Sequence, residues 1–241
     1  MIQAGGRASP RQPPLRTFLV QGQDAPGSLE AATGPDVVVV DASADESGPA
    51  LAARLIPEMR RHPQCPPLYV RISALSLGRG DAELDTIMPY GPDGIILPGA
   101  VGLRDVDHLG AKLAVQEARH DLRDEATAIV AVVGDSARGA LWLPAFPSDT
   151  PPRLVGIACD LDRLAREIRC APDAPAVAHV ASLTVLAAAA SAVPAIYMLS
   201  AGGAGDSLTV NFRDIRRQGF SAVILSDPAA VATANGVFGQ R

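Results

Sequence analysis

Lysine and cysteine are scarce in this chain of 241 residues, and each shortage excludes a class of protein. The three cysteines, Cys65, Cys159 and Cys170, are too few and too unevenly spaced for a disulfide framework, and no Cys-x-x-Cys pair indicates a zinc site. The basic residues are 20 arginines and one lysine, Lys112, without a long basic run, and the net charge is −5. We therefore expect no nucleic acid partner, because binding a polyphosphate needs a concentrated positive surface.

The chain also lacks an apolar run of the kind that targets or spans a membrane. Residues 1–14 are small, polar and proline-rich, which predicts a disordered lead-in before a barrel domain over residues 15–241. The most apolar stretch, residues 177–196, is rich in alanine and contains polar residues and a proline, which predicts a buried helix followed by a strand. We expect no membrane association and a cytoplasmic location, where cysteines stay reduced.

Short apolar runs of strand length alternate with longer segments of helical periodicity along the whole chain. The strand candidates are residues 15–21, 36–41, 67–73, 93–98, 127–134, 153–159, 195–199 and 222–226. The helix candidates are residues 51–61, 82–88, 103–122, 137–146, 161–169, 175–191, 208–218 and 228–238. This alternation predicts an α/β protein of one domain, a (β/α)8 TIM barrel without a C-terminal lid, with a doubly wound open sheet as the alternative.

Acidic residues and one arginine gather at the carboxyl ends of the predicted strands, where a (β/α)8 barrel carries its active site. The residues at these ends include Asp41, Arg71, Pro98, Asp135, Asp160 and Asp227. Several carboxylates at one barrel mouth are costly unless a cation or a substrate neutralises them. Oxygen ligands without a neighbouring His or Cys favour Mg²⁺ or Mn²⁺ over zinc.

Short motifs follow one another along the chain in a defined order. They are Arg16-Thr-Phe-Leu-Val-Gln-Gly22, Val70-Arg71-Ile72-Ser73, Asp93-Gly-Ile-Ile-Leu-Pro-Gly99, Gly134-Asp-Ser-Ala-Arg-Gly139, Asp160-Leu161, Gly219-Phe220 and Asn235-x-x-Phe238. In their order and spacing they resemble the motifs of the HpcH/HpaI aldolase and citrate lyase β-subunit superfamily. That superfamily consists of metal-dependent (β/α)8 carbon–carbon lyases, and the resemblance extends over nearly the whole chain.

The resemblance implies a divalent ion, Mg²⁺ or Mn²⁺, held by Asp135 and Asp160. Asp135 stands where the family has glutamate. The carboxylate is kept but its reach is one methylene shorter, so a bridging water could replace a direct bond. Asp160 is also a plausible helix cap, because a helical pattern follows it directly.

The resemblance further implies a substrate site beside the metal, for a small carboxylate or an acyl-CoA, so that CoA enters as part of the substrate. Arg71 would hold the substrate's carbonyl or carboxylate oxygen, a task suited to a planar donor fork that stays charged. Arg16, Pro98 and Ser136 would also contact the substrate. The resemblance implies a homo-oligomer, a trimer or a hexamer.

Several residues depart from the family's motifs. The second strand of the family ends in Asp-Leu-Glu-Asp, whereas this chain reads Asp41-Ala-Ser-Ala44. Gly99 replaces the family's lysine after Leu-Pro, and the closing segment from Ala222 to Pro228 lacks both the lysine and the histidine of the family. These departures leave the general base open among Asp41, a metal-bound water and a residue of a partner subunit.

The single lysine limits the chemistry that the barrel can perform. Lys112 falls in a predicted outer helix, so a Schiff-base aldolase route is excluded. The sequence predicts a Mg²⁺-dependent carbon–carbon lyase acting on a small oxo- or hydroxy-acid or its CoA thioester, with Arg71 and Asp41 as catalytic residues. The alternatives are a catalytically degenerate ligand-binding or structural barrel and a thioester hydrolase that uses the same site.

Overall fold

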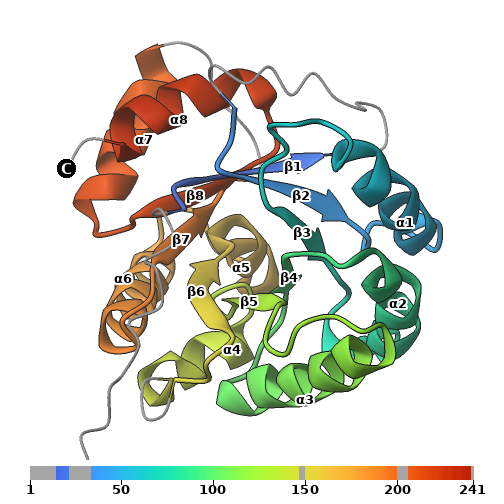
Figure 1. Ribbon diagram of the computed structural model, residues 1–241. Helices are drawn as coiled ribbons and strands as arrows, with labels where there is room; N and C mark the ends of the chain where they lie inside the picture. Colours follow the sequence, from blue (N-terminus) through green and yellow to red (C-terminus); the bar gives the residue numbers. More distant parts are fainter. Residues whose placement is uncertain (1–14, 22–33, 147–149, 200–205, 240–241) are drawn as a thin grey trace, which may run out of the picture.

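Eight parallel strands form a closed barrel inside a layer of helices (Figure 1) in this computed structural model, which describes residues 15–21, 34–146, 150–199 and 206–239. The strands are β1 (Thr17–Gln21), β2 (Val37–Asp41), β3 (Leu68–Arg71), β4 (Gly94–Leu97), β5 (Ala128–Val132), β6 (Leu154–Cys159), β7 (Ala195–Met198) and β8 (Ala222–Leu225). Each strand pairs with the next, and β8 pairs with β1. The predicted (β/α)8 barrel is confirmed, and the open sheet is excluded because the order has no edge strand. The predicted lead-in, residues 1–14, lies outside the described residues.

The helices cover the outside of the barrel in chain order. They are α1 (Gly48–Met59), α2 (Gly80–Ile87), α3 (Leu103–Arg119), α4 (Ala137–Trp142), α5 (Leu161–Ile168), α6 (Pro175–Ala190), α7 (Asp206–Arg217) and α8 (Val231–Phe238). Short 3₁₀ turns are η1 (Leu75–Leu77), η2 (Met88–Tyr90), η3 (Leu143–Ala145) and η4 (Pro228–Ala230). Both α5 and α6 lie between β6 and β7, which agrees with the two helices predicted at residues 161–169 and 175–191. In the described part of the chain, no helix has the length and apolarity needed to cross a membrane.

Alternate residues of the strands fill the barrel interior with apolar side chains, because successive residues of a strand point to opposite faces. The interior cluster consists of Phe18, Val37, Val39, Tyr69, Ile96, Val130, Val132, Ala158, Ile196, Met198, Ala222 and Ile224. A Cβ added to Gly94 would lie 2.4 Å from the Tyr69 ring, so a glycine in β4 makes room for this aromatic side chain. A second, larger apolar layer lies between the strands and the helices. The interior is therefore packed, and ligands can reach only its two ends.

The amino end of the barrel carries a buried ion pair between α3 and the segment before β6. Glu117 and Arg153 are 2% and 8% exposed, and two hydrogen bonds of 2.7 and 2.6 Å join the guanidinium to the carboxylate. The Thr127 N–H donates to the same carboxylate. Burial raises the pKa of Glu117, but the bonds from Arg153 and Thr127 outweigh it and the net shift is downward. Such a pair, with its donors satisfied, fixes the amino ends of β5 and β6.

Candidate active site at the carboxyl ends of the strands

Asp41 and Arg71 are the last residues of β2 and β3 and are direct partners in the parallel ladder. They continue the inward-facing series of Val37 and Val39 in one strand and Tyr69 in the other. Their side chains meet, with 3.6 Å between Arg71 Nη1 and Asp41 Oδ2. The structure thus brings the two predicted catalytic residues together at the barrel mouth.

The loop after β2 holds the Asp41 carboxylate in place. Its Oδ1 accepts hydrogen bonds from the backbone N–H of Ser43 at 2.9 Å and from the Ser43 hydroxyl at 2.6 Å. This is the turn in which an aspartate binds its own backbone two residues on. One oxygen therefore fixes the side chain, and the other faces Arg71.

Unpartnered buried polar atoms concentrate at this end of the barrel. Of the six buried side-chain polar atoms without a hydrogen-bond partner among the described residues, three follow or end β3 and β5: Arg71 Nε, Ser73 Oγ and Asp135 Oδ1. The other three lie on or beside helices or at the amino end of β5. Leaving a buried polar atom unpaired costs about 1–3 kcal/mol, so such atoms mark a place where a ligand or an ion would supply the partner.

An irregular segment directly after β5 turns Asp135 toward the neighbouring loop. The N–H groups of Val133 and Gly134 both donate to the Ala158 carbonyl, at 3.0 and 3.4 Å. A Cβ on Gly134 would lie 2.7 Å from the Cβ of Cys159 and near α6, so both Val133 and Gly134 face the helix layer. This interruption of the alternation leaves Asp135 directed at the loop after β4.

The Asp135 side chain is 1% exposed, and only one of its oxygens is in use. Oδ2 accepts a hydrogen bond from the Gly99 N–H at 3.0 Å and lies 3.4 Å from Arg163 Nη1. Burial raises the pKa of Asp135 above its usual value; Arg163 and the Gly99 N–H oppose the rise, and the charge of Asp160 adds to it. A carboxylate in this setting gains from a nearby cation.

Asp160 lies close enough to Asp135 for its charge to raise the pKa of that neighbour. It is 7% exposed and directly precedes α5, and its Oδ1 accepts the Arg163 N–H at 2.9 Å. Asp160 therefore caps this helix, which is the alternative role that the sequence left open. The cap uses Oδ1 and fixes the carboxylate beside Asp135.

Asp135 and Asp160 offer carboxylate oxygens, the donor type that magnesium takes in proteins, although no group of three His, Cys, Asp or Glu side chains with metal-binding geometry exists within the described residues. Magnesium commonly takes one or two protein carboxylates and keeps waters or substrate oxygens in its other positions. Asp135 Oδ1 is a buried acceptor with no hydrogen-bond donor in the described part of the protein. Arg163 is a second cation beside the same carboxylate and would compete with the ion.

Pro98, Gly99 and Ser136 serve the local structure of the mouth. Pro98 is buried and follows β4 directly, and the next residue, Gly99, has a φ of 65° that favours glycine. This turn aims the Gly99 N–H at Asp135, which explains why glycine suits the position where the family has lysine. The Ser136 hydroxyl accepts the Gly139 N–H at 3.1 Å and caps α4. Pro98 has no N–H to donate, and the Ser136 oxygen accepts at the helix cap.

Arg16 lies at the opposite, amino end of the barrel, immediately before β1. Its guanidinium pairs with Asp36, with Nη2 to Oδ1 at 2.9 Å and Nε to Oδ2 at 3.1 Å. Beside it, the Thr17 hydroxyl donates to Asn235 of α8 at 2.8 Å. The structure thus does not bring Arg16 to the other predicted site residues, because residues that precede a strand and residues that follow it lie at opposite ends of a parallel barrel.

Three residues of this region were not singled out from the sequence. Arg163 contacts Asp135 from the first turn of α5. Glu83 of α2 is buried and accepts the Ser73 backbone N–H at 2.7 Å. The Ser73 hydroxyl itself is buried and has no hydrogen-bond partner in the described structure. Spacing was an available signal for Ser73, which lies two residues after Arg71. No spacing within the sequence relates Arg163 to Asp135.

Comparisons with known proteins define the class to which this fold belongs. No protein-family model matches the chain, and no curated protein does. Solved structures match over most of its length, and several of them carry the names citrate lyase or malate synthase. The chain thus has the barrel fold of the citrate lyase β-subunit and malate synthase group, and the resemblance inferred from the motifs is confirmed at the level of the fold.

Three of these structures illustrate the match. RipC from Yersinia pestis has a TM-score of 0.74 and 20% identity, covering 94% of this chain and 95% of that one. The citrate lyase β subunit of M. tuberculosis, complexed with oxaloacetate and magnesium, has a TM-score of 0.71 and 20% identity, covering 93% and 96%. Haloferax volcanii malate synthase, in a magnesium and glyoxylate complex, has a TM-score of 0.74 and 19% identity, covering 91% and 74%.

Proposed function

We propose that this barrel is a Mg²⁺-dependent carbon–carbon lyase that cleaves a small oxo- or hydroxy-acid or its CoA thioester. The observation that carries the proposal is the set of buried, unpartnered polar atoms at one barrel end, Arg71 Nε, Ser73 Oγ and Asp135 Oδ1. Structures of similar fold with magnesium and oxaloacetate or glyoxylate support the same chemistry. A homo-oligomer, a trimer or hexamer, belongs to this proposal as well.

Asp135 and Asp160 would hold the ion. Oδ1 of Asp135 is the available acceptor, and the helix cap fixes Asp160 beside it. When bound, Mg²⁺ supplies a Lewis acid that draws electron density from the substrate oxygen as the carbon–carbon bond breaks. Asp135 is buried, so the low local dielectric strengthens its attraction for a cation.

Arg71 would bind the substrate oxygen on which negative charge develops. Its guanidinium is held by Asp41 on the neighbouring strand, and its unpartnered Nε can donate to a carboxylate or carbonyl oxygen. The Ser73 hydroxyl, two residues further on, offers a second donor. Donors fixed before the reaction stabilise developing charge without the cost of reorganisation.

Lys112 takes no part in this mechanism. It lies on α3 in the outer layer and pairs with Asp81 of α2. The chain has no other lysine. An amine that could form a Schiff base is therefore absent from the barrel mouth, and the reaction must place its electrons elsewhere.

A second candidate function, carboxylate binding without turnover, is favoured by one observation. Arg163 already places a positive charge 3.4 Å from Asp135, so the carboxylate is partly neutralised without an ion. In that case Arg71 and Arg163 would bind an acidic ligand, and Mg²⁺ would change neither its affinity nor its fate. Metal dependence separates the two functions.

The test is an activity assay with malyl-CoA and oxaloacetate in the presence and absence of Mg²⁺. A lyase releases acetyl-CoA and glyoxylate from malyl-CoA, whereas a thioester hydrolase releases free CoA. We expect cleavage that requires Mg²⁺ and is lost in Asp135→Asn and in Arg71→Gln. Arg104→Gln, at the start of α3, serves as the control with unchanged activity. Ligand binding without any metal-dependent product in the wild type would overturn the proposal in favour of the binding protein.

A further inference from the structure

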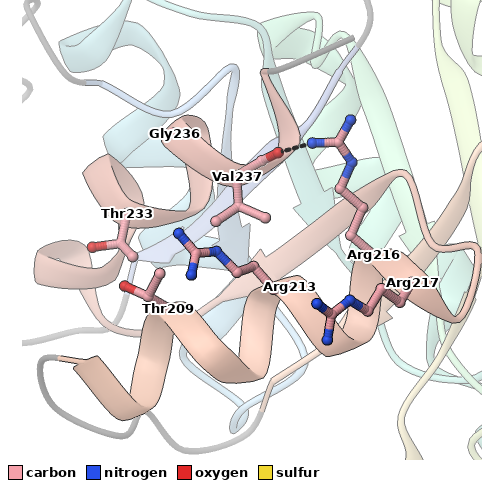
Figure 2. Close-up of a pocket in the computed structure, with 7 residues that line it drawn as sticks. All are labelled: Thr209, Arg213, Arg216, Arg217, Thr233, Gly236 and Val237. Carbon is pink, nitrogen blue, oxygen red and sulfur yellow. Dashed lines mark hydrogen bonds between the residues drawn. The ribbon is translucent and has the colours of Figure 1, made fainter.

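A groove of about 540 Å³ lies between α7 and α8 on the outer face of the barrel (Figure 2). Its charged lining residues are three arginines, Arg213, Arg216 and Arg217, and its polar lining includes the hydroxyls of Thr209 and Thr233. None of the described lining residues is acidic, although the chain as a whole has a net charge of −5. The groove is therefore a local concentration of positive charge on an acidic protein.

Helical spacing explains how these side chains meet. Thr209, Arg213, Arg216 and Arg217 are separated by four, three and one residues, which places them on one face of α7. Across the groove, α8 contributes Thr233 and, three and four residues later, backbone at Gly236 and Val237. Figure 2 shows Arg213 and Arg216 reaching toward this second helix, with Arg217 lying along α7. Like charges on one helix face repel each other, so Arg213 gains no stability from its neighbours Arg216 and Arg217.

Two of the three arginines have structural uses, but Arg213 has none among the described contacts. Arg216 donates a hydrogen bond to the Val237 carbonyl, and Arg217 Nη1 lies 3.1 Å from Asp214 Oδ1. Both belong to the last turn of α7, where a cation is favoured by the helix dipole. Arg213 precedes that turn, and no described residue accepts a hydrogen bond from it. Its guanidinium faces the groove with its charge available to a ligand.

Gly236 keeps the groove open. It lies inside α8, where glycine is a poor helix former, and a Cβ added there would meet no atom within 4 Å. Packing therefore does not require a glycine. The missing side chain instead leaves space beside the arginines, in which a ligand can approach the helix backbone.

We propose that this groove binds a small phosphorylated ligand whose phosphate or pyrophosphate group is held by Arg213 and Arg217. Arg217 exchanges its exposed partner Asp214 for the ligand, and the threonine hydroxyls add hydrogen bonds. Guanidinium forks match phosphate oxygens in pairs, and two of them suit a group of more than one negative charge. The groove is larger than a phosphate alone and falls in the size range of small-molecule sites, so the ligand has an organic part. The site is separate from the barrel mouth and does not depend on the proposed lyase activity.

The experiment uses inorganic pyrophosphate as the probe, titrated calorimetrically into the full chain in buffer with EDTA, so that binding to magnesium plays no part. We expect saturable binding of one pyrophosphate per chain. Arg213→Gln should weaken it at least tenfold, about 1.4 kcal/mol. Gly236→Leu should weaken it by a similar factor, because it fills the groove and leaves every charge in place. Arg138→Gln, an arginine of α4 elsewhere on the barrel, should bind as the wild type does.

Two further variants and a vesicle measurement make the result decisive. Thermal melting of each variant establishes that it folds, and Gly236→Ala provides a smaller filling of the groove if the leucine variant fails to fold. Binding that Arg71→Gln abolishes and Arg213→Gln leaves intact would place pyrophosphate at the barrel mouth and overturn the proposal. The absence of saturable binding by the wild type, or Arg213-dependent binding only to phosphatidic acid vesicles, would overturn it as well.

Discussion

Replacing Arg163 by methionine should strengthen magnesium binding at the barrel mouth. Arg163 Nη1 lies 3.4 Å from Oδ2 of Asp135, the same carboxylate that we assign to the ion. A guanidinium and a divalent cation on one carboxylate repel each other, so the arginine lowers the affinity for the metal. Methionine keeps much of the length of the side chain and a high helix propensity. The backbone N–H of Arg163, which donates to the capping carboxylate of Asp160, is unaffected by the change.

The size of the effect follows from distance and exposure. Two unit charges about 4 Å apart interact by about 4 kcal/mol at an effective dielectric constant of about 20. The Arg163 side chain is 46% exposed, so water screens much of that energy, and fully exposed pairs give only about 0–1 kcal/mol. A value between these limits, about 1.4 kcal/mol, corresponds to a tenfold change in the dissociation constant.

Calorimetric titration of Mg²⁺ into wild type and Arg163→Met measures this change directly. Arg166→Met is the matched control, because Arg166 lies one turn further along α5. We expect Arg163→Met to bind Mg²⁺ about tenfold more tightly than the wild type. The control should bind Mg²⁺ with the affinity of the wild type. Equal or weaker binding by Arg163→Met would refute the reasoning, since it would mean that the ion does not use Asp135.

Three further outcomes are expected. Arg153→Met should lower the free energy of unfolding by about 3–5 kcal/mol, measured with urea at pH 7, because Glu117 then remains buried without its partner; since the pKa of Glu117 is lowered in the folded state, the wild type should lose this advantage as the pH falls through that pKa. Asp135→Asn should raise the melting temperature in metal-free buffer at pH 7. Burial raises the pKa of Asp135, so its ionised form destabilises the folded state once the pH rises above the unfolded pKa of about 3.9. An unchanged melting temperature at pH 7, or an increase that persists at pH 3, would contradict this. Arg71→Lys should reduce kcat/KM by about 10- to 100-fold, the loss of a charged hydrogen bond of about 1.5–3 kcal/mol, while the melting temperature stays close to that of the wild type.

The strands of the barrel were predictable because each is a short apolar run of strand length, and such runs are typical of strands buried on both faces. Four consecutive valines between Asp36 and Asp41 are completely buried in β2, as a strand covered on both faces requires. The boundaries of helices were less certain. α1 begins at Gly48, before the predicted residue 51. A proline is tolerated in its first turn, because the N–H that proline lacks would have no partner within the helix there.

The site was predictable where strand register decides it and unpredictable where contacts between loops decide it. Asp41 and Arg71 end adjacent strands, so parallel pairing brings them together. The direction of Asp135 depends on the break in alternation at Val133 and Gly134, which no periodicity reveals. Motif matching alone assigned Arg16 to the site.

The position of Arg16 relative to its strand was enough to exclude it from the barrel mouth. It precedes β1, and the mouth is lined by residues that end or follow the strands. The contact of Arg163 with Asp135 joins two different strand-helix units, and no spacing within the sequence predicts such a contact.

The most direct test of the account is a Mn²⁺ titration of the full chain followed by electron paramagnetic resonance. We expect one saturable ion per chain, with at least tenfold weaker binding in Asp135→Asn and in Asp160→Asn. Asparagine preserves the cap at position 160, so the second variant removes charge alone. Asp227→Asn is the control, since Asp227 also follows a strand but caps η4. A wild type without a saturable site, or one whose affinity survives both substitutions together, would contradict the central claim.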